Sequence, residues 1–242
     1  MSDPHEQVVR FNGRERAQHL LVMLLFTTLA VTGFPQKFHD AAWAQFLVRL
    51  LGGIGDVRSI HRIAGVMFAG LAFTHLITAV AAVLTGRSSL SMVPTRKDFQ
   101  DTVTTLRYYL RLSDVHAEFD RFDYREKFEY WGIVMGGIIM IVTGFVLYFP
   151  MAVTHWLPGQ LVPAAKVAHS NEGLMAFLVV ITWHVYNVHF APEVFPFNKT
   201  MFTGKISREH MRQHHGLEYA RRFPSDAASG KDDGKAHEPT ES

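Results

Sequence analysis

Five histidines lie inside apolar stretches of this sequence, where an imidazole is rare and marks a functional site by default. They are His19, His61, His75, His169 and His184. In regular helices, His61 and His75 would stand roughly 21 Å apart along the axis, and His169 and His184 roughly 22 Å. Each spacing leaves the two imidazoles within about 60° of each other around the axis, so both can face one interior. The pattern predicts two layers of potential metal ligands.

Two layers restrict the metal chemistry. Zinc needs its ligands clustered at one point, which two layers do not provide. Bis-imidazole ligation of two b-type haems needs four histidines from facing helices at this separation, and the sequence therefore predicts two b haems. His61 and His169 are each followed four residues later by a glycine, which lets a flat macrocycle lie against the backbone. They form the firmest predicted pair, whereas spacing alone would pair His184 with His75.

Four apolar runs must position these histidines: residues 20–35, 60–84, 130–149 and 168–190. Runs near 20 residues match the ~30 Å hydrocarbon thickness of a bilayer. The predicted fold class is an all-α integral membrane protein, a four-transmembrane-helix bundle with amphipathic surface helices in its loops. Residues 39–51 and 98–112 have the period of those surface helices, and residues 201–222 read as a basic helix with a flanking loop.

The basic residues are distributed unevenly although the net charge is only +2. Three Lys/Arg precede the first run, eight lie between the second and third runs, and eight follow the fourth. By the positive-inside rule, both termini are expected in the cytoplasm of a multi-pass protein. We expect residues 1–222 to form one membrane domain and residues 223–242 a disordered cytoplasmic tail.

The chain has no cysteine, which excludes disulfides, cysteine-held iron–sulfur clusters and covalently attached c-type haem within it. Any such centre must sit on a partner.

Two further polar residues have open roles. Arg62 could neutralise haem propionates or anchor its helix at the interface. His189 could serve a quinone or a third haem, or be an interfacial polar residue.

The motifs around the histidines carry a family resemblance over residues 10–222. They are Arg16–Ala17–Gln18–His19, Ile60–His61–Arg62–Ile63–Ala64–Gly65, His169-x3-Gly173 with His184–Val185–Tyr186, and Gly204–Lys205-x-Ser207 followed by His214–His215. The chain resembles the cytochrome b (gamma) subunit of respiratory formate dehydrogenases. It is also similar to the related b subunits of membrane nickel–iron hydrogenases and thiosulfate reductases.

The resemblance implies a bacterial inner-membrane subunit that passes electrons between a periplasmic redox partner and a membrane quinone. It implies that His61 and His169 hold the outer haem, and that His19 and His184 hold the inner haem beside the quinone. His75 has no counterpart in that pattern, so His19 and His75 remain alternatives, and three haems are conceivable. The carboxylates that could exchange protons with quinone are Asp123, Glu126 and Glu129, which could equally form an interfacial charge cluster.

The implied partners are a periplasmic iron–sulfur subunit or multihaem cytochrome c with a catalytic subunit, together with quinone and membrane lipid; no nucleic-acid partner is expected. The chain would be the electron-transfer subunit of an oxidoreductase rather than its catalytic centre. Two alternatives are a haem-to-haem relay without a quinone site and a haem-free membrane anchor. The sequence identifies neither the terminal substrate nor the direction of electron flow.

Overall fold

The computed structural model describes residues 6–86, 90–192 and 194–226. Among these residues, four segments are long and apolar enough to cross a membrane, and they confirm the four predicted runs. They are α1 (Gly13–Lys37), α3 (Ile54–Leu84), α5 (Tyr124–Tyr148) and the segment Leu161–Phe190, which comprises α7 (Leu161–Val179) and the π-helical turns η1 (Val180–His184) and η2 (Tyr186–Phe190). Leu24, Val66 and Phe145 on these helices are more than half exposed, as contact with lipid requires.

The described chain divides into two compact units. The membrane unit contains Phe11–Ser88 and Glu129–Phe202, and the terminal unit draws on Met1–Arg10, Ser89–Phe128 and Thr203–Ser242. Helix α5 begins in the terminal unit and continues through the membrane unit. The C-terminal segment that we expected to be disordered falls mostly outside the described residues, which end at Asp226.

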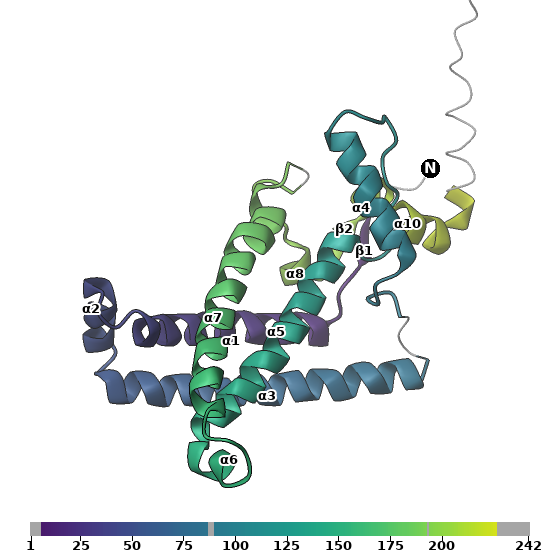
Figure 1. The fold of residues 1–242 in the computed structure, drawn as a ribbon. Helices are drawn as coiled ribbons and strands as arrows, with labels where there is room; N and C mark the ends of the chain where they lie inside the picture. The colour runs from purple at the N-terminus through teal and green to yellow at the C-terminus, as the bar shows by residue number, and fades with distance from the viewer. Residues whose placement is uncertain (1–5, 87–89, 193, 227–242) are drawn as a thin grey trace, which may run out of the picture. The chain divides into compact units, whose positions relative to one another are not determined.

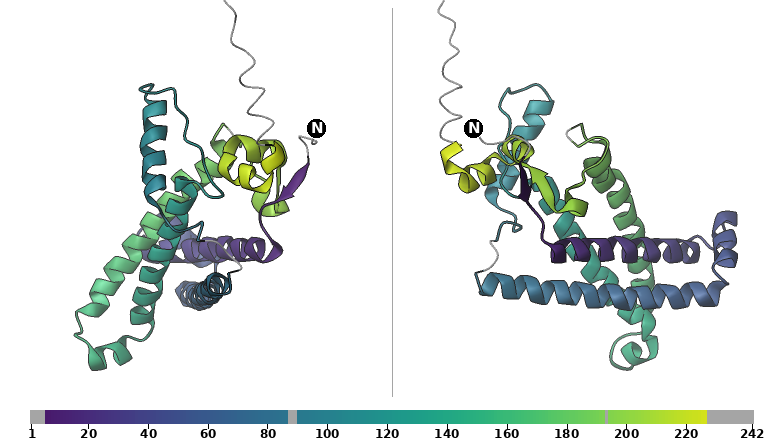
Figure 2. Two further views of the ribbon diagram at one scale, coloured as in Figure 1. Left: turned by 90° about the vertical axis from the view of Figure 1, so that its right-hand side faces the viewer. Right: turned by 180° about the vertical axis from the view of Figure 1, so that it is seen from behind.

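The membrane unit is built from two helical hairpins. Helices α1 and α3 lie side by side and antiparallel, joined through the short α2 (Ala42–Leu50). Helices α5 and α7 form the second hairpin, joined through α6 (Pro150–Trp156) (Figures 1 and 2). The link between the two helices of each hairpin is short, and short links favour neighbouring antiparallel helices.

Side chains join the two hairpins. Phe34 of α1 packs edge-on against Phe177 of α7, with ring centroids 4.8 Å apart. The Arg62 guanidinium of α3 lies over the Tyr148 ring of α5, 5.3 Å from its centroid. Each helix of one hairpin therefore contacts a helix of the other, and the four form one bundle.

Local sequence fixes where the first hairpin begins and turns. The Asn12 side chain accepts a hydrogen bond from the Glu15 backbone N–H at 2.9 Å, and the Glu15 carboxylate accepts one from the Asn12 N–H at 2.7 Å. This capping box starts α1. Gly52 and Gly53 have φ of +92° and +108°, which only glycine adopts readily, and they allow the tight turn between α2 and α3. These two signals set the positions of His19 and His61 along their helices.

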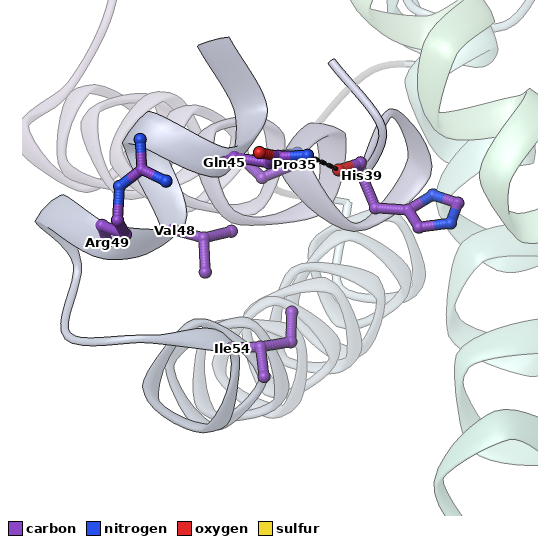
Figure 3. A pocket seen from close by; sticks show the side chains of 6 residues that line it. All are labelled: Pro35, His39, Gln45, Val48, Arg49 and Ile54. Atoms are coloured by element: carbon purple, nitrogen blue, oxygen red, sulfur yellow. Dashed lines mark hydrogen bonds between the residues drawn. The ribbon is translucent and has the colours of Figure 1, made fainter. Parts of the chain in front are cut away.

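A hollow of about 310 Å³ lies where α1, α2 and α3 meet (Figure 3). Its lining consists of Pro35, His39, Gln45, Val48, Arg49 and Ile54. It contains none of the five histidines of the apolar helices.

The terminal unit joins the two ends of the chain to the segment before α5. Its elements are β1 (Gln7–Val9), α4 (Arg96–Tyr109), β2 (Lys205–Ser207), α9 (Arg208–His214) and α10 (Gly216–Arg222), and α8 (Thr200–Thr203) leads into it. The two strands pair antiparallel with Val8 opposite Ile206, and Ile206 packs with the buried Met211 and Tyr219. The basic helix with a flanking loop that we expected over residues 201–222 is therefore replaced by a strand and short helices, because Lys205–Ser207 pair with the distant N-terminal strand.

A buried carboxylate lies at the centre of the terminal unit's charges. Glu218, only 3% exposed, accepts hydrogen bonds from Arg10 at 3.3 Å and Arg121 at 3.4 Å, and forms an ion pair with Arg222 at 2.7 Å. Arg10 is 4% exposed and also pairs with Glu126 at 3.4 Å. Because buried charges are tolerated only when they are paired, this network ties the N-terminal strand to α10 and to the start of α5.

Acidification is expected to destabilise the terminal unit through His215. Burial, with a smaller contribution from the nearby Arg10 charge, lowers the pKa of His215 to about 4. The unfolded chain, with a pKa near 6.5, binds the proton more readily, so stability is full above about pH 6.5 and falls as the pH drops towards 4. Between pH 7 and pH 5 the loss should be about 2 kcal/mol.

Hydrogen exchange of the β1 and β2 amides at the two pH values, corrected for the intrinsic rate, measures this loss. In His215→Gln, whose amide can still donate to the Asp120 carbonyl that Nδ1 meets at 2.9 Å, the contribution of this residue should vanish, so that the variant loses about 2 kcal/mol less than the wild type between the two pH values. An unchanged pH dependence in that variant would assign the effect to other groups.

Candidate functional site

The first histidine pair joins the two hairpins through His61 of α3 and His169 of α7, whose ring centroids lie 6.2 Å apart at an interplanar angle of 77°. Each imidazole is held by a threonine of its own hairpin. Thr32 Oγ1 lies 2.9 Å from His61 Nδ1, and Thr143 Oγ1 lies 2.9 Å from His169 Nδ1. The sequence predicted this pair, and the structure brings its members together.

The threonines also fix which imidazole nitrogen carries the proton. Thr32 Oγ1 donates its own hydrogen to the Thr28 carbonyl at 2.7 Å, and Thr143 Oγ1 donates to the Ile139 carbonyl at 2.6 Å. Each hydroxyl oxygen is then left to accept from the histidine, so Nδ1 carries the hydrogen and Nε2 keeps its lone pair. An imidazole in this state is ready to bind a metal through Nε2.

Two glycines next to these threonines make room for the rings. A Cβ on Gly33 would lie 3.1 Å from His61 Cε1, and a Cβ on Gly144 would lie 3.3 Å from His169 Cε1. Both distances are tighter than ordinary van der Waals contact. The glycines that the sequence singled out, Gly65 and Gly173, instead face Leu29 at 4.0 Å and Met140 at 3.5 Å.

Sequence reasoning missed these supporting residues, although a signal for them exists. Residues 31–34 and 142–145 both read Val-Thr-Gly-Phe, 111 residues apart. His61 and Gly65 recur as His169 and Gly173 at an offset of 108 residues. The two hairpins therefore repeat one design, in which a Thr-Gly step on the first helix holds a histidine on the second.

The second pair consists of His19 of α1 and His184 of η1, with ring centroids 6.1 Å apart at an interplanar angle of 42°. His184 Nδ1 lies 2.8 Å from Glu129 Oε2, and because a carboxylate only accepts, His184 donates from Nδ1 and again leaves Nε2 for a metal. His19 Nδ1 is buried without a hydrogen-bond partner among the described residues. Glu129, predicted as a quinone-site carboxylate, is thus a direct neighbour of this pair.

The π-helical turns explain how His184 reaches its partner. His184 is fifteen residues after His169, whereas the corresponding histidines of α3, His61 and His75, are fourteen apart. A π turn accommodates one extra residue, and such turns are frequent at functional sites. Because the π turn η1 accommodates this extra residue, His184 lies on the same face of its helix as it would if it followed His169 by fourteen residues in a regular α-helix.

The structure places His19, rather than His75, beside His184. His75 has both ring nitrogens engaged elsewhere: Nε2 lies 2.9 Å from the Tyr130 hydroxyl, and Nδ1 lies 3.3 Å from Gln18 Oε1. The alternative that spacing alone favoured, a His75–His184 pair, is not the arrangement found.

Both pairs have the separation that one six-coordinate iron requires. With a metal–nitrogen bond of about 2.0 Å and a ring centroid about 1.1 Å beyond it, two imidazoles on opposite sides of an iron have centroids about 6.2 Å apart. Tetrahedral ligation would bring them to about 5 Å. No cluster of three or more His, Asp or Glu able to hold a metal ion occurs among the described residues. The residues therefore fit haem, and do not fit zinc.

The remaining predicted site residues have other described contacts. Arg62 stacks on Tyr148, and the His189 ring stacks on Phe197 with centroids 4.8 Å apart. Asp123 and Glu126 belong to the terminal unit, where Asp123 pairs with Arg125 at 2.8 Å and Glu126 with Arg10. Of the four predicted quinone-site residues, only Glu129 has a described hydrogen bond to a paired histidine.

Comparison with known proteins identifies the family. Residues 10–204 match the sequence model of prokaryotic cytochrome b561. The chain is similar to the cytochrome b556(Fdn) subunit of the nitrate-inducible formate dehydrogenase of Escherichia coli K12. It is 21% identical over 230 residues, which covers 95% of this chain and 98% of the relative. The subunits of the same name from Escherichia coli O157:H7 and Shigella flexneri match equally well.

These matches confirm the resemblance inferred from the histidine motifs. With the four apolar helices, they also confirm a multi-pass protein of the bacterial inner membrane and an electron-transport function based on haem b. The chain belongs to the prokaryotic cytochrome b561 family.

Proposed function

We propose that this chain is the diheme b-type cytochrome subunit of a respiratory oxidoreductase, and that it transfers electrons across the membrane between a periplasmic redox partner and the quinone pool. The observation that carries the proposal is the presence of two histidine pairs, His61–His169 and His19–His184, with ring centroids 6.2 and 6.1 Å apart. We assign the first pair to an outer haem and the second to an inner haem.

The chain's own residues supply ligation and orientation. Thr32 and Thr143 hold the outer imidazoles through Nδ1, so that Nε2 would be free to bind a haem iron, and Glu129 does the same for His184. A haem held by each pair would supply one-electron chemistry. The carboxylate of Glu129 makes its imidazole a stronger electron donor than a threonine hydroxyl does, so we expect the two sites to differ in reduction potential.

Partners must supply the rest of the electron path. Because the chain has no cysteine, an iron–sulfur cluster or a c-type haem that exchanges electrons with the outer pair must lie on another subunit. The relatives are subunits of a formate dehydrogenase. We propose a complex of that type, with an iron–sulfur subunit and a catalytic subunit outside the membrane, and with both termini of this chain in the cytoplasm.

The haem content of the purified chain tests the proposal. Dithionite reduction should give Soret and α bands of b-type haem, and pyridine extraction should give two haems per chain. Membranes containing the complex should show haem reduction by a quinol. Absence of both bands would leave the haem-free anchor, and haem without any reaction with quinol would leave the haem-to-haem relay.

Filling the space beside an outer histidine should remove the outer haem selectively. In Gly33→Val, the new Cβ would lie 3.1 Å from His61 Cε1 and the branched side chain would crowd the imidazole, so we expect more than half of the chains to lose the outer haem while the inner haem is retained. Gly132→Val is the matched control, since a Cβ there meets nothing within 4 Å. Equal haem content in the two variants would contradict the assignment of the outer site.

A further inference from the structure

The two hairpins repeat each other at the inner pair as well as at the outer one. At the offset of 111 residues that relates the two Val-Thr-Gly-Phe segments, Gln18 corresponds to Glu129 and His19 to Tyr130. His75 of α3 corresponds to His184 at an offset of 109, the additional residue being the one absorbed in the π turn. The inner pair His19–His184 therefore has a counterpart in Tyr130–His75.

The counterpart has the same internal arrangement. Its ring centroids lie 5.9 Å apart, against 6.1 Å in the inner pair. Gln18 Oε1 meets His75 Nδ1 at 3.3 Å, as Glu129 Oε2 meets His184 Nδ1 at 2.8 Å. Gln18, which contacts His75, directly precedes His19 of the inner pair. Glu129, which contacts His184, directly precedes Tyr130 of the counterpart. The two pairs are therefore connected through adjacent residues of α1 and of α5.

The Tyr130–His75 pair does not have room for an iron. A tyrosine oxygen lies about 2.8 Å from its ring centroid, so a histidine and a tyrosine bound to one iron from opposite sides through a bent metal–O–C angle would have centroids about 7 Å apart. Instead the Tyr130 hydroxyl and His75 Nε2 are in direct hydrogen-bond contact at 2.9 Å. Where the repeat of the two hairpins would put a second inner pair of metal ligands, the chain has a hydrogen-bonded phenol–imidazole pair.

The hydrogen positions in this pair follow from its neighbours. Gln18 Oε1 can only accept, so Nδ1 of His75 carries its hydrogen and Nε2 accepts from the Tyr130 hydroxyl. The phenol oxygen still has acceptor capacity for an incoming O–H group. Both side chains are half-buried, and the flanking Phe73 and Leu76 are 65% and 58% exposed on the face that would meet lipid.

We propose that Tyr130 and His75 bind the polar head group of a quinone, a planar apolar ring with two oxygens that reaches the site from the bilayer. Oxidation of one quinol releases two electrons and two protons. The two electrons would pass one at a time to a haem bound by the neighbouring His19–His184 pair. One proton passes from the quinol hydroxyl to the Tyr130 oxygen as the tyrosine gives its own to His75, and the second passes to solvent. The proposal rests on the quinone reaction of the proposed function and names its binding residues.

Stopped-flow reduction of the oxidised complex by decylubiquinol, and separately by a short-chain menaquinol, tests this site. In Tyr130→Phe we expect the rate constant of haem reduction to fall at least tenfold, with two haems per chain and an unchanged rate with dithionite. The matched control is Tyr148→Phe on the same helix, which should react like the wild type. His75→Gln can still accept the hydroxyl's hydrogen bond and should retain more activity than His75→Leu.

Each outcome decides one question. A Tyr130→Phe rate within twofold of the wild type would overturn the assignment, and so would loss of a haem in that variant, because the pair would then belong to a haem site. If both quinols fail to reduce the wild-type complex while dithionite succeeds, the quinone reaction itself is refuted, and this site with it.

Discussion

Replacing His19 with alanine is expected to lower the haem content from two per chain to one, whereas replacing His75 with alanine should leave two. His19 lies across from His184 at the separation that a bis-imidazole iron needs, while His75 is hydrogen-bonded to Tyr130 and Gln18. A haem held by both imidazoles would lose one of its two bonds to the protein in His19→Ala and would be weakly held. The two variants therefore distinguish a histidine that we propose as a haem ligand from a histidine at similar depth that we do not.

Pyridine haemochrome content and the low-temperature α band of both variants measure this difference. His61→Ala and His169→Ala should each lose the other haem, so that the remaining spectrum differs from that of His19→Ala. Loss of haem in His75→Ala, together with full content in His19→Ala, would show that His184 takes the partner that spacing alone suggested.

Removing the buried carboxylate of the terminal unit should have the largest effect on stability. In Glu218→Leu, the Arg10 guanidinium stays buried and loses the Glu218 carboxylate, and Arg121 and Arg222 lose the same partner. Breaking a buried charge network in this way costs about 3–5 kcal/mol. The protection of the β1 and β2 amides against hydrogen exchange should fall accordingly, because Arg10 directly follows β1.

Glu209→Gln provides the matched control in the same unit. Its carboxylate pairs with Arg212 at 2.9 Å on an exposed turn of α9, and such surface pairs contribute at most about 1 kcal/mol. Comparable loss of protection in the two variants would mean that the network adds nothing beyond an exposed ion pair.

Hydropathy and histidine spacing were sufficient to predict the four spanning helices and the outer pair. The apolar runs are nearly uniform in composition, and His61 and His169 each begin a motif with glycine four residues later. The family resemblance, rather than the spacing, favoured His19 as the partner of His184. Spacing was misleading there because it compares histidines on the same helix, whereas His19 is the only one of the five on α1.

Contacts between distant segments were not predicted. The β1–β2 pair joins residues about 200 positions apart through three residues each, too few for a strand period to be recognised. The roles of Thr32 and Thr143 were missed for a different reason. A threonine in an apolar helix usually bonds its own backbone, and nothing local distinguishes one that also faces a histidine on the next helix.

The two-hairpin construction has a consequence for biogenesis. Neither hairpin contains a complete pair: His61 and His19 are on the first, and His169 and His184 are on the second. A haem bound at either site would therefore bridge segments that leave the ribosome more than 100 residues apart. Loading of the inner site would have to wait until residue 184 has entered the bilayer, and a haem bound at either site would add to the side-chain contacts that hold the two halves together. The apoprotein is accordingly expected to hold its two hairpins together less firmly than the haem-bound form, which would make haem supply a checkpoint for assembly and a determinant of the chain's lifetime in the cell.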